Sequence, residues 1–172
     1  LHDAPGYPNQ IDGIGAGVNY GMCNSLFIDN IGNNTSSLFE INGAAANAIL
    51  YNYVGDCARA ANQNPVIMAA IYHHGPHSFM NLVEGNTIPV LTNDGYHGSA
   101  SHDVIFRNNI NGRHSTFSYD RRLLNLCRGS YYHSVVGNII GDPSWAPDGY
   151  AGAGAFGHDE GYIYVLGYPN AG

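Results

Sequence analysis

The sequence predicts an all-β protein, a right-handed parallel β-helix in which short strands stack coil upon coil. Its composition and one repeated motif support this prediction. The 172 residues include 23 glycines and 20 asparagines, and only 11% of the residues are charged. Gly and Asn readily adopt the left-handed backbone conformations of tight turns, so this composition indicates a chain that turns often.

The motif consists of an apolar residue, an Asn three positions later and usually a second apolar residue two positions after that. Its asparagines are Asn30, Asn52, Asn86, Asn108 and Asn138. Their spacings are 22, 34, 22 and 30 residues. We interpret 22 residues as one coil and the longer spacings as coils with looped-out insertions.

Stacked asparagines can form a ladder of amide hydrogen bonds along the coils. The apolar residues expected to stack inside the coils are Ile49, Val83, Ile105 and Val135. A β-sandwich is the alternative fold, and the two equal spacings favour the β-helix.

The chain is expected to form one domain over residues 1–172. Within it we expect an irregular lead-in at 1–20, coils over 24–141, and a Gly-rich tail at 142–172 with one further strand at 162–166. The tail should pack along the coils or cover the last one. The insertions are placed within 55–80 and 112–132, and they should flank an uninterrupted coil between Asn86 and Asn108.

Charge and hydropathy disfavour two classes of partner. The formal net charge is −7 without a basic run, which disfavours nucleic acid. No apolar run reaches the length of about 20 residues that a membrane-spanning helix needs. Because the chain starts at Leu1, we interpret it as a processed or excised piece. Cys23, Cys57 and Cys127 are odd in number and lack CxxC spacing, so buried free thiols are expected.

Several runs resemble those of bacterial right-handed β-helix proteins of the pectate-lyase-like superfamily. They are HGPHSFMNLVEGNTI, HGSASHDVIFRNNINGR, GSYYHSVVGNIIGD and YVLGYPN, and the resemblance covers roughly residues 37–170. It implies a middle-to-late portion of a longer protein, located outside the cell or at its surface, with polysaccharide as the partner.

The same resemblance suggests which catalytic residues to look for. Lyases of this kind use carboxylate-bound calcium with an Arg or Lys base, and the hydrolases use paired Asp residues. This chain has no Lys, no adjacent Asp pair and no recognisable three-carboxylate calcium cluster. If it is an enzyme, it is a polysaccharide lyase or a glycoside hydrolase. Calcium is the only cofactor that the resemblance suggests, and none is predicted.

Candidate binding residues gather in three consecutive coils. In these coils a polar residue precedes Gly at His74, His97 and Arg128. If these turns stack, the three side chains form a column that can bind the carboxylates of a polysaccharide. Asp94 and the loop at 112–122 should flank this column. The other candidate binding residues are His102, Arg121 and Arg122.

The catalytic candidates are Glu84, Arg107 and Asp94. Glu84 and Arg107 are expected on adjacent coils, either as an acid–base pair or as a cross-coil salt bridge, and the salt bridge is favoured. The run of histidines from His73 to His77 is not predicted to bind a metal, because its Gly-Pro step disrupts a regular ligand geometry.

Two functions remain open at this point. The first is an extracellular module that binds or degrades a polysaccharide, acidic or neutral. The alternative is a structural fibre, adhesin or surface-assembly protein, in which β-helices stack end to end through their exposed strand edges.

Overall fold

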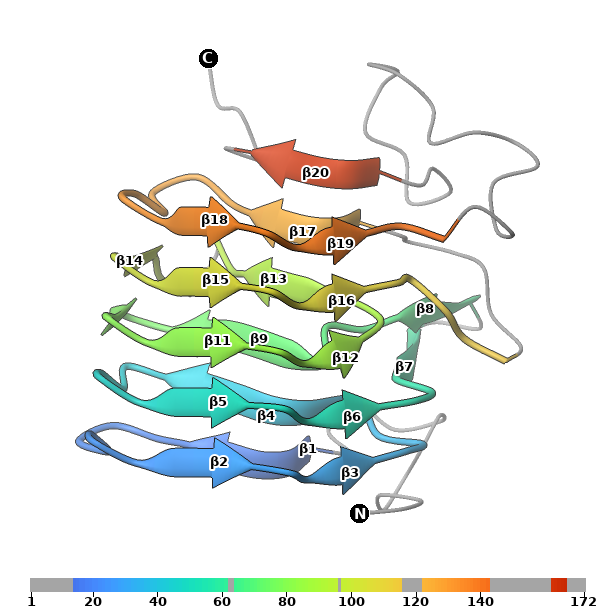
Figure 1. Cartoon of the computed structure of the whole chain (residues 1–172), viewed down its shortest axis with the longest axis horizontal. Helices are drawn as coiled ribbons and strands as arrows, with labels where there is room; N and C mark the ends of the chain where they lie inside the picture. Colours follow the sequence, from blue (N-terminus) through green and yellow to red (C-terminus); the bar gives the residue numbers. More distant parts are fainter. Residues whose placement is uncertain (1–13, 62–63, 96, 116–121, 143–161, 167–172) are drawn as a thin grey trace.

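A computed structural model describes residues 14–61, 64–95, 97–115, 122–142 and 162–166 (Figure 1). In this part of the chain the regular elements are β-strands and no helix occurs. None of the described residues therefore belongs to a helix able to span a membrane. Strands from successive stretches of sequence lie one above another, as in a β-solenoid.

Three parallel sheets run along the solenoid. The first contains β1 (Ile14–Val18), β4 (Ser37–Asn42), β9 (Ile71–Gly75), β13 (Leu91–Asn93), β17 (Arg122–Leu126) and β20 (Tyr162–Leu166). The second contains β2 (Leu26–Ile28), β5 (Ala48–Leu50), β11 (Leu82–Glu84), β15 (Val104–Phe106) and β18 (Ser134–Val136). The third contains β3 (Ile31–Gly32), β6 (Tyr53–Val54), β12 (Thr87–Ile88), β16 (Asn109–Ile110) and β19 (Ile139–Ile140).

Two smaller strand pairs complete the architecture. The parallel pair of β10 (Ser78–Phe79) and β14 (Ala100–Ser101) lies between the first and second sheets along the chain. The antiparallel pair of β7 (Ala58–Ala61) and β8 (Asn64–Ile67) forms the first insertion. Its base closes where the Met68 amide donates to the Cys57 carbonyl at 3.0 Å. The predicted all-β, parallel solenoid is thus confirmed.

The predicted asparagine ladder is present at every expected rung. The Oδ1 atom of Asn52 accepts hydrogen bonds from both the backbone and the side-chain nitrogen of Asn30, each at 2.9 Å. The same pair of hydrogen bonds joins Asn52 to Asn86, Asn86 to Asn108, and Asn108 to Asn138. The spacings of 22, 34, 22 and 30 residues are therefore the lengths of consecutive coils.

A second ladder, which the sequence analysis missed, runs five positions before the first. Its members are Ser25, Asn47, Asn81, Asp103 and His133. Asn47 donates its backbone N–H to Oδ1 of Asn81 at 3.1 Å, and Asn81 donates likewise to Oδ1 of Asp103 at 2.8 Å. Only two of the five members are asparagines, which explains why a search for repeated Asn did not find it.

The residue before each ladder position turns the chain with a positive φ. Met80 and His102 precede the second ladder with a φ of 57°, and Arg107 precedes the first with a φ of 54°. Non-glycine residues seldom adopt this conformation. The amide ladders therefore hold a bend at both ends of the second sheet in every coil.

The inward-facing residues agree with the prediction. Ile49 and Val83 are fully buried, Ile105 is 1% exposed, and Val135 is partly buried against the same core. Cys57 and Cys127 are buried free thiols, as expected, and burial raises the pKa of Cys57 to about 12. Cys23 is exposed, contrary to the prediction, because it lies in the first described coil at the end of the stack.

The lead-in requires a correction, whereas the strand expected in the tail is present. Within the lead-in predicted to be irregular, Ile14–Val18 form β1, which pairs with β4, and Val18 is fully buried. The expected strand at 162–166 is present as β20. It pairs with β17 as the terminal strand of the first sheet, and this part of the tail therefore covers the last coil at that sheet, one of the two expected positions. Residues 1–13, 143–161 and 167–172 lie outside the described part.

The coil between Asn86 and Asn108 has the expected length of 22 residues, but its turns differ in length from those of the coil between Asn30 and Asn52. Phe39 and Leu91 both pair with Ile71, so they occupy equivalent positions. Phe39 follows Asn30 by nine positions, whereas Leu91 follows Asn86 by only five. The shortened turn before Leu91 is offset by a longer turn after it. Both coils therefore contain 22 residues, but with different distributions of turn length.

Candidate functional site

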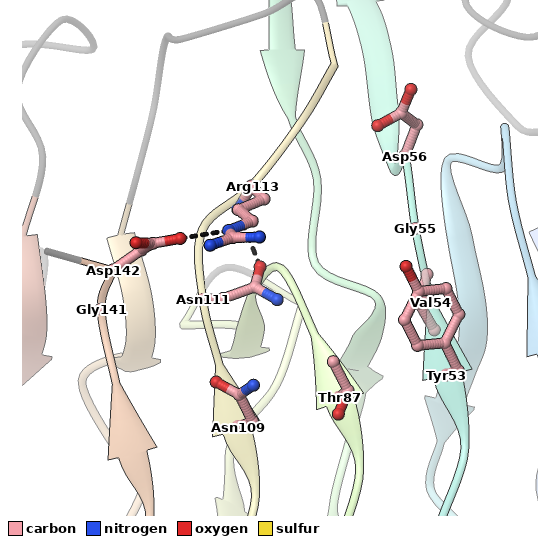
Figure 2. A pocket seen from close by; sticks show the side chains of 10 residues that line it. All are labelled: Tyr53, Val54, Gly55, Asp56, Thr87, Asn109, Asn111, Arg113, Gly141 and Asp142. Atoms are coloured by element: carbon pink, nitrogen blue, oxygen red, sulfur yellow. Dashed lines mark hydrogen bonds and ion pairs between the residues drawn. The ribbon is translucent and has the colours of Figure 1, made fainter. Parts of the chain in front are cut away.

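A well-defined concavity lies on the outer side of the third sheet, at the carboxyl ends of its strands (Figure 2). Its volume is about 380 Å³, within the range of about 300–1,000 Å³ typical of ligand pockets. We call it the Arg113 pocket. It is lined by Tyr53, Val54, Gly55, Asp56, Thr87, Asn109, Asn111, Arg113, Gly141 and Asp142.

The floor of the Arg113 pocket follows directly from strand alternation. Tyr53, Thr87 and Asn109 are register partners on β6, β12 and β16. The residue after each of them, in order Val54, Ile88 and Ile110, is buried in the core. Because side chains alternate across a strand, the three floor residues face outward as one column. The pocket thus crosses successive coils.

One wall is formed where the second insertion folds back over the short turn that precedes Leu91. The Ser115 backbone N–H donates to Oδ1 of Asp56 at 2.8 Å, and the Ser115 hydroxyl donates to Oδ2. These residues are 59 positions apart and belong to different coils. The neighbouring His114 is buried, and this burial lowers its pKa.

The opposite wall is an ion pair. Arg113 donates through Nε to Asp142, and its backbone N–H donates to Oδ1 of Asn111 at 2.8 Å. Asp142 is 6% exposed, whereas Arg113 is 62% exposed. The carboxylate raises the pKa of Arg113, so the guanidinium stays charged. The 112–122 loop was expected to flank the His74, His97 and Arg128 column, and its residue Arg113 lines this pocket.

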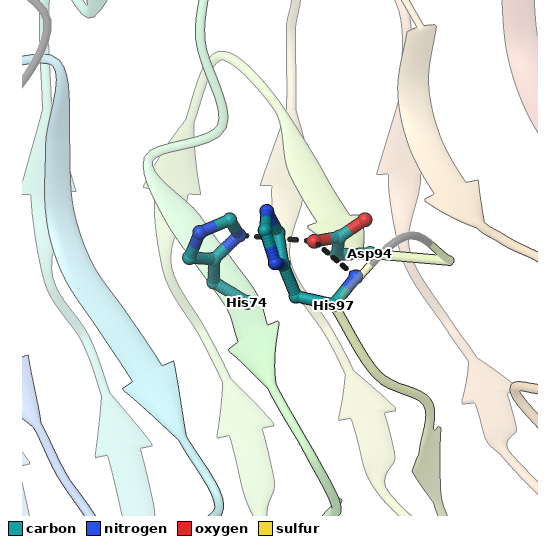
Figure 3. A group of neighbouring side chains, drawn as sticks. All are labelled: His74, Asp94 and His97. Carbon is teal, nitrogen blue, oxygen red and sulfur yellow. Dashed lines mark hydrogen bonds and ion pairs between the residues drawn. The ribbon is translucent and has the colours of Figure 1, made fainter.

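A second cluster combines His74, Asp94 and His97 on the outer side of the first sheet (Figure 3). Nδ1 of His74 lies 3.0 Å from Oδ2 of Asp94. The rings of His74 and His97 have centroids 4.4 Å apart. His97 also donates its backbone N–H to Oδ2 of Asp94 at 3.3 Å. We call this group the His–Asp–His cluster.

The long turn after β13 brings His97 to this place. Leu91 precedes its second-ladder residue, Asp103, by twelve positions, whereas the equivalent Phe39 precedes Asn47 by eight. The additional length carries His97 back over β9. Asp94, and not His97, is the strand neighbour of His74, since the Asp94 amide donates to the His73 carbonyl at 2.8 Å.

Two members of the predicted column, His74 and His97, lie together. Asp94 lies beside them, and Arg128 is exposed just after the end of β17, the strand that pairs with β13. His102 lies elsewhere, with its ring 4.9 Å from that of Tyr132. Arg122, at the start of β17, lines a shallow cavity of about 170 Å³ with Tyr72 and Asn125. Arg121 lies outside the described residues.

The catalytic candidates Glu84 and Arg107 form a cross-coil ion pair, the alternative that the sequence favoured. The Tyr51 hydroxyl donates to the same carboxylate oxygen at 3.2 Å. Hydrogen bonding to Glu84 raises the pKa of Arg107, and the guanidinium lowers the pKa of Glu84. A general base of this type would need a lowered pKa. The pairing therefore opposes a role of Arg107 in proton abstraction.

A group of buried titratable side chains lies inside the coils. Oδ2 of Asp103 is 3.7 Å from Nδ1 of His73 and 3.5 Å from Nδ1 of His133. Burial raises the pKa of Asp103 to about 6 and lowers the pKa of His73 to about 4. At neutral pH the ladder position of Asp103 therefore holds a carboxylate beside a neutral imidazole. Sequence reasoning did not identify this group.

Comparison with known proteins adds no candidate for either site. No family model, curated protein or solved structure matches this chain. The geometry of the Arg113 pocket and of the His–Asp–His cluster therefore carries the functional inference.

Proposed function

We propose that this chain is a portion of an extracellular, right-handed β-helix of the pectate-lyase-like kind that binds polysaccharide. The observation that carries the proposal is the Arg113 pocket, which crosses successive coils and offers an aromatic side chain among polar ones. A right-handed coil is expected because parallel strands in one sheet are joined by right-handed crossovers in about 98% of cases.

The pocket has the groups that a chain of sugar rings requires. Tyr53 is 53% exposed and offers a ring face for stacking on a pyranose. Thr87, Asn109 and Asn111 supply hydroxyl and amide groups for hydrogen bonds with sugar hydroxyls. Because equivalent strands repeat along the solenoid, consecutive coils present polar groups at regular intervals to consecutive sugar units.

The charges favour a neutral polysaccharide in this pocket. Two carboxylates, Asp56 and Asp142, line it against the single guanidinium of Arg113, which is already paired with Asp142. A polyuronate would bring further negative charge into this environment, and its binding would be opposed. The acidic ligand expected for the His74, His97 and Arg128 column remains a separate prediction.

Affinity electrophoresis on gels that contain neutral or acidic polysaccharides tests the proposal. We expect retardation by at least one neutral polysaccharide and about a tenfold weaker affinity for Tyr53→Ala, since an aromatic contact contributes up to about 1.5 kcal/mol. Tyr131→Ala is the matched control, because Tyr131 is 62% exposed and does not line the pocket. Equal affinity of both variants, or no retardation by any neutral polysaccharide, contradicts this assignment.

End-to-end assembly is the second candidate function, and a separate observation favours it. Among the described residues β2 pairs only with β5, and β18 pairs only with β15. Leu26 on β2 is 60% exposed and Val136 on β18 is 55% exposed. Open strand edges beside apolar side chains promote pairing between copies. Light scattering and electron microscopy at micromolar concentration should then show long rods, and a monodisperse small particle would exclude assembly by the chain alone.

A further inference from the structure

We propose that the His–Asp–His cluster binds a divalent transition-metal ion of the zinc type. His74, Asp94 and His97 each offer one ligand atom, and these atoms all lie within 4.8 Å of one another. The ligands come from two adjacent coils, with His74 on β9 and the other two residues at the end of β13 and in the turn that follows it. The site is separate from the Arg113 pocket and does not depend on polysaccharide binding.

The distances between the ligand atoms suit a small ion. Zinc bonds of about 2.0–2.1 Å in a tetrahedral site require ligand atoms roughly 3.3 Å apart. The atoms of His74 and Asp94 are already 3.0 Å apart. His97 is exposed and lies in the longest of the equivalent turns, so it has room to complete the geometry by rotation of its side chain.

The ligand types select the kind of ion. Two imidazole nitrogens and one carboxylate oxygen are the ligands that zinc and its first-row neighbours prefer. Calcium, the cofactor suggested by the sequence resemblance, takes six to eight oxygen ligands. Asp94 supplies the only carboxylate of this cluster. The site should therefore bind zinc or cobalt and should not bind calcium measurably.

Neighbouring groups hold two of the ligands in place. The His97 backbone N–H donates to Oδ2 of Asp94, which fixes the carboxylate against the turn. The ring of Tyr72 lies 4.7 Å from that of His74. Such outer partners orient metal ligands and support their affinity.

The arrangement leaves a coordination position open to solution. Three protein ligands do not complete a tetrahedron, and 32% of the His74 side chain is exposed. Zinc sites with three protein ligands take water or an added ligand in the fourth position. The bound ion would also fasten the turn that carries His97 to β9, which links two coils.

Titration of the purified chain with Co²⁺, followed by visible absorption, is the direct test, and Zn²⁺ should displace the cobalt. We expect His97→Ala to weaken cobalt binding at least tenfold and Asp94→Asn to weaken it as well. His102→Ala is the matched control, because His102 is also an exposed histidine but lies outside the cluster. Zinc should raise the melting temperature of the wild type and of His102→Ala, but not that of His97→Ala.

The pH provides an independent check. Imidazole must lose its proton to bind a metal, so the affinity for Co²⁺ should be weaker in acidic than in neutral solution. The proposal is overturned if the chain shows no cobalt absorption, or if His97→Ala and His102→Ala bind cobalt equally well. Displacement of cobalt by millimolar Ca²⁺ would also overturn it. Because polysaccharide retardation is measured separately, failure of one proposal leaves the other intact.

Discussion

Replacement of Asn108 with Leu should measure how much the asparagine ladder stabilises the fold. Asn108 is 1% exposed, and its side chain makes four hydrogen bonds. Its Oδ1 accepts from the backbone and side-chain nitrogens of Asn86 at 3.0 and 2.9 Å. Its Nδ2 donates to the Val83 carbonyl and to Oδ1 of Asn138 at 2.9 and 3.0 Å.

The expected loss of stability follows from the hydrogen bonds that the partners of Asn108 lose. The Asn86 backbone N–H is left without its acceptor in a fully buried residue, which costs about 1–3 kcal/mol. The other three hydrogen bonds contribute about 0.5–1.5 kcal/mol each, offset in part by burial of the Leu side chain. Leu has the same branched arrangement of side-chain heavy atoms as Asn, so a large cavity does not form. The free energy of unfolding should fall by about 2–4 kcal/mol.

Urea denaturation followed by far-ultraviolet circular dichroism provides the assay. Asn109→Leu is the control, because Asn109 is the adjacent residue and points outward from β16. We expect it to change stability by less than about 0.5 kcal/mol. Asn30→Leu, at the exposed end of the ladder, should fall between the two. Equal stability of the Asn108 and Asn109 variants would show that the ladder accompanies the coil without stabilising it.

Two further substitutions test other parts of the coil. Burial raises the pKa of Asp103 from 3.8 to about 6, so this carboxyl group holds its proton more tightly in the folded than in the unfolded protein. The free energy of unfolding should therefore fall as pH rises from about 4 to about 6. Asp103→Asn should remove this fall. In urea denaturation the variant should be more stable than wild type by up to about 3 kcal/mol at pH 7 and by almost nothing at pH 4. A difference in stability that does not change with pH contradicts the reasoning. Gly112→Ala should lower the melting temperature more than Gly129→Ala does, because both glycines have positive φ but an added Cβ would lie 2.4 Å from Leu123 Cδ2 at the first and 3.3 Å from Ser99 Cβ at the second. Equal shifts would show that backbone strain alone decides the cost.

The sequence predicted most of the fold because the first ladder requires the same chemistry in every coil. Asn supplies an amide donor and an acceptor on a short side chain at each bend, so Asn52, Asn86 and Asn108 recur visibly. The inward positions of Ile49 and Val83 follow from the same register. The second ladder tolerates Ser, Asn, Asp and His, and this variety concealed it although its offset of five residues is constant.

The candidate sites depended on information that spacing does not contain. A spacing of 22 residues sets the total length of the turns in a coil but not how that length is divided among them. The short turn before Leu91 lets Ser115 reach Asp56, and the long turn after it carries His97 to His74. Only the tertiary structure decided this division, because strand pairing in neighbouring coils determines where each turn begins and ends.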